Sequence, residues 1–209
     1  MTDATRALQR LSEGNRRFVA GESDATATVR HGHVPGFAPA QKPVAIVLAC
    51  SDARVPTELI FDQGIGDLFV IRVAGNVVAP SQVGSVEFAA QQFGTPLVVV
   101  LGHSHCGAVK ATLDELAKKE DHRSPNLRAI VDRIRPAIEP LLEEDVDHDS
   151  NDFVNAAVRA NVLASVERLR HGSIIIEDLI DSGDLKIVGA EYSIESGTVE
   201  FLPEQDSLD

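Results

Sequence analysis

Two cysteines and a histidine stand where a folded chain could bring them together. Cys50 directly follows the apolar run Val44–Ala49, and Cys106 comes three residues after His103, shortly beyond the apolar run Leu97–Leu101. Thiolate and imidazole ligands favour zinc over magnesium or calcium. Three protein ligands leave one position of a tetrahedral zinc open, which is typical of a catalytic rather than a structural site. The spacing therefore predicts a Cys-His-Cys zinc site.

The same residues admit other interpretations. A lone buried cysteine is usually an inert small hydrophobic residue, and two cysteines can form a redox dithiol, although the CxxC spacing is absent here. His103 is favoured over His105 as the partner of Cys106, because two intervening residues let the chain fold back onto one ion, whereas neighbouring side chains diverge. We expect His105 at the rim of a pocket or in solvent.

Asp52 and Arg54 follow Cys50 in the segment that leaves the first apolar run. As a surface ion pair they would contribute little to stability. Beside a metal, the arginine would keep the carboxylate ionised, and an ionised carboxylate accepts hydrogen bonds but never donates them. Asp52 then either orients a hydroxide toward an electrophile or becomes a fourth metal ligand that closes the site. The residue pattern leaves both roles open.

Apolar runs alternate with helical patterns along most of the chain. Continuous β-branched runs are typical of strands buried on both faces of a parallel sheet, and their alternation with helices predicts an α/β fold. Ligands of such folds gather at the carboxyl ends of the strands, where the cysteines stand. We expect a central, mainly parallel sheet with strands at 44–49, 67–73, 97–101 and 185–192, an antiparallel edge strand at 198–202, and flanking helices at 56–63, 81–93, 107–119, 127–142, 152–171 and 173–181.

The N-terminal segment differs from this core. Residues 2–22 predict an amphipathic helix with Asn15 away from its apolar face, and residues 23–43, rich in Ala, Pro and Gly, predict an extended arm. Farther along, Pro136 and Pro140 are expected to break a helix. We expect one domain over residues 1–209, with an N-terminal helix and arm at 1–43 and the α/β core at 44–209.

Composition excludes several classes of protein. The 209 residues include 19 Lys and Arg against 32 Asp and Glu, for a formal charge of −13. This charge repels phosphate backbones, so we expect no nucleic-acid partner. The longest apolar run, Val44–Cys50, is far too short to span a membrane, and the N-terminus lacks the apolar stretch of a signal peptide. A secreted protein held by disulfides usually has more than two cysteines, so we expect a reduced, cytoplasmic protein without membrane partners.

Three segments together resemble the β-class carbonic anhydrases. They are Cys50–Val55 (CSDARV), Gly66–Asn76 (GDLFVIRVAGN) and Gly102–Gly107 (GHSHCG). The CxDxR and HxxC patterns are a specific signal of this family. The resemblance is clearest over residues 41–111, and the N-terminal helix and the closing segment are similar in kind.

The resemblance implies a fold, a cofactor and an activity. It places zinc on Cys50, His103 and Cys106, with Asp52 and Arg54 as the catalytic dyad. It implies reversible hydration of carbon dioxide to bicarbonate and a proton by zinc-bound hydroxide. It also implies a homodimer whose active sites lie at the subunit interface, often paired again into a homotetramer.

Five further residues match positions of the substrate pocket in this family. Gln41 matches a glutamine that binds substrate, and Phe69 matches an apolar wall. Phe88 stands where many members have tyrosine, and Ala74 stands where valine is common. Gly107 offers a backbone N–H to a bound ligand. The resemblance thus implies that these five residues bind the substrate.

One subgroup of the family has a second, inhibitory bicarbonate site built from a Trp, an Arg and a Tyr. Here Val47 occupies the tryptophan position and the chain has no Trp, while Arg72 and Tyr192 match the other two. With Gln41 present, the resemblance implies the subgroup in which Asp52 stays off the metal. Alternative functions for the same residues are hydrolysis of carbonyl sulfide or carbon disulfide, and a non-catalytic zinc-binding module.

Overall fold

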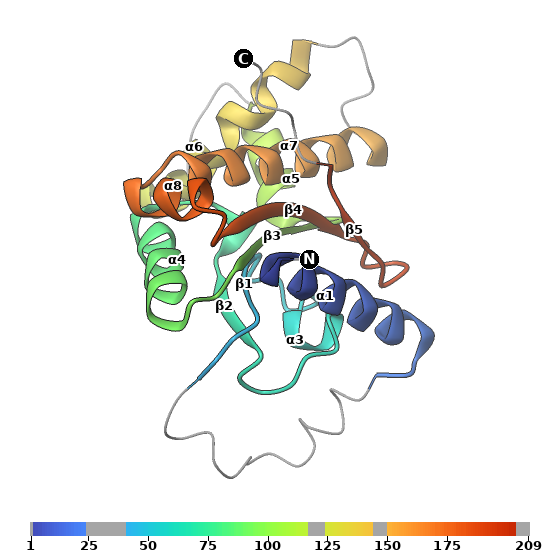
Figure 1. The fold of residues 1–209 in the computed structure, drawn as a ribbon. Helices are drawn as coiled ribbons and strands as arrows, with labels where there is room; N and C mark the ends of the chain where they lie inside the picture. Colours follow the sequence, from blue (N-terminus) through green and yellow to red (C-terminus); the bar gives the residue numbers. More distant parts are fainter. Residues whose placement is uncertain (1, 24–40, 117–123, 144–149, 204–209) are drawn as a thin grey trace.

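The computed structural model describes residues 2–23, 41–116, 124–143 and 150–203. Within these residues, five strands form one sheet in the order β2-β1-β3-β4-β5 (Figure 1). Strands β2, β1, β3 and β4 are parallel, and β5 pairs antiparallel with β4 at one edge. The predicted α/β sheet is thus confirmed. Its strands are β1 (Ala45–Ala49), β2 (Leu68–Arg72), β3 (Leu97–His103), β4 (Lys186–Tyr192) and β5 (Val199–Phe201).

Helices cover both faces of this sheet (Figure 1). One face packs against α1 (Asp3–Ala20) and α3 (Thr57–Ile60), and the other against α4 (Pro80–Phe93), α7 (Asn151–Arg170) and α8 (Ile174–Asp181). Helices α5 (Gly107–Leu116) and α6 (Pro125–Ile138) pack with α7 near the carboxyl ends of the strands. Two 3-10 turns complete the described elements, η1 (Ala74–Asn76) and η2 (Glu139–Glu143).

Strand β1 shows why the sheet is buried on both sides. Its side chains alternate between the two faces, so Ile46 and Leu48 pack toward α4, α7 and α8, while Val47 and Ala49 pack toward α1 and α3. All five residues of β1 are buried. A strand without a polar face must lie inside the sheet, and β1 lies between β2 and β3. The residue that follows it, Cys50, therefore stands at the carboxyl edge between these two strands.

One prediction about the N-terminal helix is wrong. Asn15 faces the protein interior and is only 5% exposed. Its Nδ2 donates to the carbonyl oxygens of Ile60, at 3.1 Å, and Gly197, at 2.9 Å, and its Oδ1 accepts from the Val199 N–H at 2.8 Å. A buried amide is tolerated when its hydrogen bonds are satisfied, so hydrophobic periodicity does not detect it. Asn15 thereby ties α1 to α3 and to the edge strand β5.

The break expected at Pro136 is also absent. Helix α6 continues through Pro136 to Ile138, and the chain then tightens into the 3-10 turn η2, which contains Pro140. Proline lacks one backbone donor and its ring clashes with the carbonyl of the preceding turn, and here the helix ends two residues later instead of at the proline itself. Most of the predicted arm at 23–43 lies outside the described residues.

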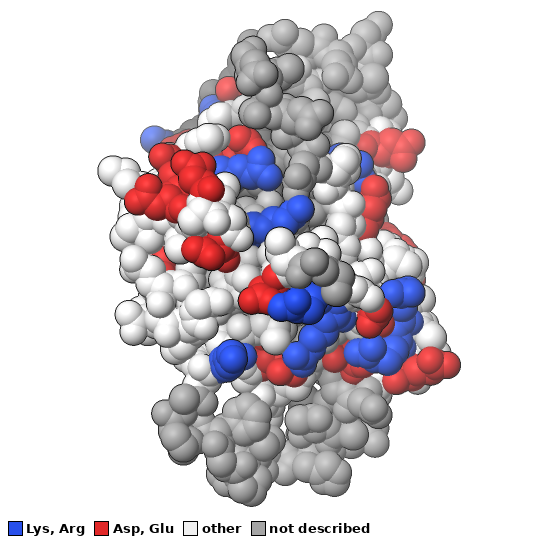
Figure 2. Space-filling model, in the orientation of Figure 1, with Lys and Arg blue, Asp and Glu red and all other residues white. Residues whose placement is uncertain are grey.

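The charged surface is mixed in sign. Lys and Arg side chains gather along α1 on the face drawn in Figure 2, beside carboxylates. Arg10 pairs with Asp67 at 2.7 Å and Arg17 pairs with Asp62 at 2.5 Å, so the arginines of α1 are in part neutralised. Among the helices that the structure describes, none is long and apolar enough to cross a bilayer.

Candidate metal centre

The sheet topology brings the two cysteines and His103 together. Strands β1 and β3 are parallel neighbours with Ala49 opposite Leu101, so Cys50 and His103 leave the sheet at the same edge. Cys106 lies directly before α5, on the short connection from β3. The ligand atoms of the three residues lie within 4.8 Å of one another, and all three residues are buried. Ligand atoms around a tetrahedral zinc are about 3.5–3.8 Å apart, so small side-chain movements suffice to bind an ion.

His103 presents one nitrogen to this cluster. Its Nδ1 lies 2.8 Å from the carbonyl oxygen of Ser104, and because a carbonyl oxygen only accepts, Nδ1 must carry the proton. Nε2 is then an acceptor, and it is buried without a hydrogen-bond partner among the described residues. An unpaired buried acceptor costs free energy, which coordination to a metal would remove. The donor set therefore fits a metal ion, and its two sulfurs and one imidazole fit zinc.

The two cysteines interact with each other and with backbone N–H groups. The Cys106 thiol donates to Cys50 Sγ, and this bond lowers the pKa of Cys50, while the same bond and burial raise the pKa of Cys106. Cys50 Sγ also accepts from the Gly75 N–H at 3.3 Å. At the start of α5, the N–H groups of Ala108 and Val109 donate to Cys106. Backbone N–H groups thus stabilise negative charge on both sulfurs, the form in which cysteine binds a metal.

Asp52 and Arg54 form a fixed pair beside the cluster. Asp52 Oδ1 accepts from the backbone N–H of Arg54 at 2.9 Å and from its Nε at 3.0 Å, and Oδ2 accepts from Nη2 at 2.8 Å. The guanidinium holds the pKa of the Asp52 carboxyl well below its usual range. Oδ2 also lies 3.9 Å from His103 Nε2. The structure therefore places an ionised, immobilised carboxylate next to the three potential ligands.

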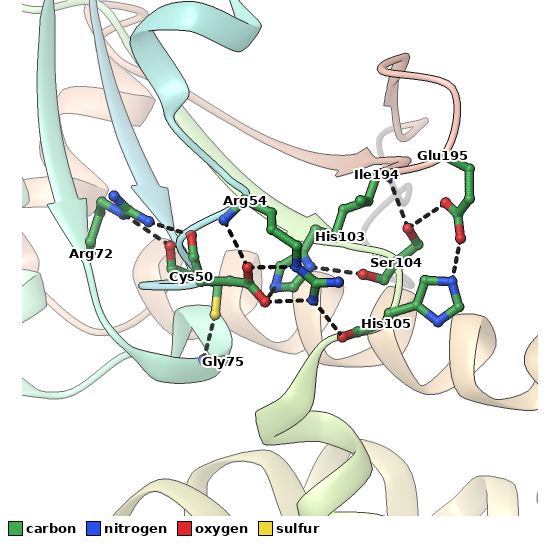
Figure 3. A network of polar contacts seen from close by, with 10 residues as sticks. Cys50, Arg54, Arg72, Gly75, His103, Ser104, His105, Ile194 and Glu195 are labelled. Atoms are coloured by element: carbon green, nitrogen blue, oxygen red, sulfur yellow. Dashed lines mark hydrogen bonds and ion pairs between the residues drawn. The ribbon is translucent and has the colours of Figure 1, made fainter.

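Arg72 holds the segment that carries these residues. This last residue of β2 donates from Nε to the Cys50 carbonyl at 3.1 Å and from Nη2 to the Asp52 carbonyl at 2.6 Å (Figure 3). The sequence pattern assigned Arg72 no role at the metal. The signal that could have indicated this role is a cation at the carboxyl end of a strand beside β1. Because Arg72 binds backbone carbonyls, which every residue has, its role cannot be read from the residue types of CxDxR.

His105 points away from the cluster. Its Nε2 contacts Glu195 Oε1, and the imidazole is about half exposed. Ser104 also donates to Glu195, at 2.8 Å, and this bond is the main reason that the pKa of Glu195 falls to about 2. His105 and Ser104 line a polar cavity of about 470 Å³ between α7, β4 and the turn before β5. His105 thus lies at a pocket rim, as the spacing predicted.

The five predicted pocket residues do not gather around the cluster within one chain. Ala74 and Gly107 adjoin it, since Ala74 precedes Gly75 and Gly107 follows Cys106. Gln41 lies before β1, at the opposite end of that strand from Cys50, and it is exposed. The aromatic pair lies apart as well: Phe69 pairs with Ile46 near the start of the strands and contacts Phe88 of α4, with ring centroids 6.3 Å apart.

Comparison with known proteins identifies the family. The family model described as carbonic anhydrase matches residues 45–199. Carbonic anhydrase 2 of Mycobacterium tuberculosis is 39% identical over 198 residues, which cover 94% of this chain and 91% of that protein. The chain belongs to the carbonic anhydrase family.

Solved structures place this carbonic anhydrase in the β class. The β-carbonic anhydrase CafA of Aspergillus fumigatus superposes with a TM-score of 0.71 at 27% identity, covering 85% of this chain and 84% of that one. The fold is shared with a structure from work on two tetrameric β-carbonic anhydrases of Sordaria macrospora, at a TM-score of 0.72, 24% identity, and coverage of 90% of this chain and 96% of that one. β-Carbonic anhydrases are metalloenzymes, and the buried Cys-His-Cys cluster is a group of residues here that could hold the metal.

We expect Arg72→Met to lower the kcat/KM of this carbonic anhydrase by roughly 10- to 100-fold, because displacement of a reacting group by about 1 Å has effects of this size. The metal content should stay at the wild-type level, since each ligand remains. Metal analysis and stopped-flow carbon dioxide hydration measure the two quantities. Arg159→Met is the matched control, because Arg159 binds the carboxylates of Glu191 and Glu200 rather than the backbone of the Cys50–Asp52 segment. Equal kcat/KM in the two variants would contradict the role of Arg72.

Proposed function

We propose that this chain catalyses the reversible hydration of carbon dioxide to bicarbonate and a proton with zinc held by Cys50, His103 and Cys106. One observation carries the proposal. The buried Nε2 of His103 has no partner among the described residues, and it faces two cysteine sulfurs beside a carboxylate that Arg54 immobilises. The relatives described above support the reaction, because they are carbonic anhydrases.

The metal ligands, Asp52 and Arg54 have different roles in the proposed reaction. Zinc bound by this donor set would supply a Lewis acid that lowers the pKa of a coordinated water toward neutrality. Asp52 is ionised at neutral pH and can only accept a hydrogen bond, so it binds the proton-bearing side of the attacking water or hydroxide. The lone pair then points away from the carboxylate, toward carbon dioxide. Arg54 supplies the orientation, since its three bonds leave the Asp52 carboxylate one position relative to His103.

We propose an open metal site for this chain. Asp52 would have to break its hydrogen bonds with the Arg54 side chain, at 3.0 and 2.8 Å, before it could become a fourth ligand. In the structure both carboxylate oxygens are bonded to Arg54, and Oδ2 lies 3.9 Å from His103 Nε2. The fourth position on the metal is then available for water, as a hydration catalyst requires.

We also propose that the substrate pocket is completed by a second copy of the chain. Phe69 lies level with Ile46, four residues before Cys50, which is roughly 13 Å along the strand. Gln41 lies farther back still, so these residues can reach a metal centre only across an interface. Phe88 is 52% exposed and Ile65 is 44% exposed beside the edge strand β2. This face offers an apolar surface for the partner, and the related Sordaria macrospora enzymes, described as tetrameric, support an oligomer.

We expect Phe88→Glu to convert the oligomer to a monomer and to lower hydration activity at least tenfold, because a charge in an apolar interface opposes association. Size-exclusion chromatography with light scattering gives the mass. Ile174→Glu is the control, since Ile174 is an even more exposed apolar residue, at 77%, on α8. An oligomer and an activity that both survive Phe88→Glu would exclude this interface.

The proposed reaction has a direct test. Stopped-flow carbon dioxide hydration is measured on purified protein whose zinc content is known, before and after removal of the metal by a chelator, and after zinc is restored. Activity should follow the zinc content. Zinc-replete protein that hydrates only at the background rate would refute the proposal. Faster turnover of carbonyl sulfide or carbon disulfide would indicate one of these as the substrate instead.

We also propose that the protein acts in the cytoplasm. Its two cysteines are free thiols, which is typical of a reducing compartment.

A further inference from the structure

A layer of polar contacts connects helix α7 to the sulfur of Cys50. The Gly75 N–H donates to Cys50 Sγ at 3.3 Å in a buried position, and the Gly75 carbonyl accepts from Asn161 Nδ2 at 2.8 Å. One helical turn further along α7, Ser165 Oγ donates to the Asn76 carbonyl at 3.2 Å. Two consecutive carbonyls of the turn η1 are therefore held by one face of α7. The Gly75 N–H of the same turn holds the sulfur of Cys50.

The turn η1 has little freedom to relax around these contacts. Gly75 has a φ of 67°, in the left-handed region, and a Cβ at this position would lie 2.8 Å from Ile134 Cδ1 and 3.0 Å from Ala108 Cβ. Asn76 also has a positive φ, 44°. The upstream side of the turn is bonded to β1, since Val73 and Ala49 form a backbone hydrogen bond of 3.1 Å. The downstream side depends on α7.

Asn161 is conspicuous within this layer for its burial. It is 1% exposed, and its Oδ1 has no partner among the described residues, as is also true of the buried Nδ2 of Asn76. An apolar residue would avoid the free-energy cost of the unpaired Oδ1 but would leave the buried Gly75 carbonyl without this donor. The amide is therefore explained by its hold on Gly75. Its Nδ2 donates to Gly75, the residue whose N–H donates to the cysteine sulfur.

We propose that Asn161 is a positioning residue for Cys50: it holds the Gly75 carbonyl so that the Gly75 N–H stays on the sulfur when a metal is bound. This inference rests on the proposed metal site. A hydrogen bond to a thiolate withdraws electron density from it and fixes its direction, and such outer contacts tune both metal affinity and ligand geometry. Asn161 would thus affect the metal without touching it.

The test uses cobalt as a spectroscopic substitute for zinc. We expect Asn161→Ala to shift the thiolate-to-cobalt charge-transfer band and to weaken zinc binding by about 10- to 100-fold in competition with a chelator. Asn161→Asp keeps the size but removes the donor, and it should change both quantities in the same direction. It also provides a readout if the alanine variant does not fold.

Asn15→Ala is the matched control. Asn15 is likewise a buried amide that holds backbone carbonyls, but those of Ile60 and Gly197. A general loss of stability would affect this variant too, whereas its cobalt spectrum and zinc affinity should equal those of the wild type. An unchanged spectrum and affinity in both Asn161 variants would overturn the positioning role. Failure of the wild-type protein to bind either metal would instead overturn the proposed function.

Discussion

Cys106→Ala is expected to abolish metal binding and to reduce carbon dioxide hydration to the background rate. The remaining Cys50 and His103 would be two ligands where a catalytic zinc needs three. The substitution removes one sulfur from a residue that is 1% exposed, so the cavity it leaves is small and the fold should persist. Metal analysis of the purified variant measures the first effect, and stopped-flow hydration measures the second.

Val109→Ala distinguishes the loss of a ligand from the loss of packing. Val109 is also 1% exposed, lies on the first turn of α5 and belongs to the same apolar cluster as Cys106. Its truncation should lower the melting temperature while leaving the metal content and the hydration rate near their wild-type values. A Cys106→Ala protein that keeps a full complement of zinc would show that this sulfur is not a ligand.

The cluster could be predicted because its members occupy the ends of strands. A continuous apolar run predicts a strand buried on both faces, and parallel strands end at one edge, so Cys50 and His103 had to meet if β1 and β3 were neighbours. The two-residue spacing between His103 and Cys106 is a local constraint that needs no tertiary information. Both kinds of signal are carried by residue type and periodicity, and the structure brings these side chains within 4.8 Å of one another.

The supporting residues could not be predicted in this way. Arg72, Asn161 and Asn15 all act by donating to backbone carbonyls that lie far away in the sequence. A carbonyl is present at every position, so the partner leaves no trace in the pattern of residue types. The burial of Asn15 depends on three backbone groups that come together only in the folded chain. The sequence pattern therefore placed Asn15 away from the apolar face of α1.

Pocket residues raise a different difficulty. The resemblance assigned Gln41, Phe69 and Phe88 to the substrate, but one chain places them away from Cys50. Sequence spacing says nothing of which copy of a chain supplies a residue. The exposure of Phe88 supports the proposal that a second copy covers it, since half of a large aromatic side chain faces solvent.

Asp52→Asn should retain zinc and lose hydration activity by about 100-fold, a size typical of residues that orient the groups around a metal. Asparagine has nearly the same shape, but its amide donates where the carboxylate accepts. It would set a donor against the N–H groups of Arg54 and lose its fixed position. In the wild type, Arg54 holds the pKa of Asp52 well below its usual range, so the titration of Asp52 should not appear in the pH–rate profile near neutrality.

The same pair predicts how stability depends on acidity. A carboxyl whose pKa is lowered by folding contributes stability above its unfolded pKa of about 3.9 and loses it as the pH falls through the lower folded pKa. Wild-type protein should therefore lose more stability than Asp52→Asn on acidification below about pH 4.

Asp67→Asn is the matched control for the hydration activity of Asp52→Asn, because Asp67 also pairs with an arginine, Arg10, and accepts from a backbone N–H, that of Gly64. If Asp52→Asn turns over carbon dioxide as fast as Asp67→Asn, the carboxylate does not orient the nucleophile, and the hydration mechanism must depend on the metal ligands alone.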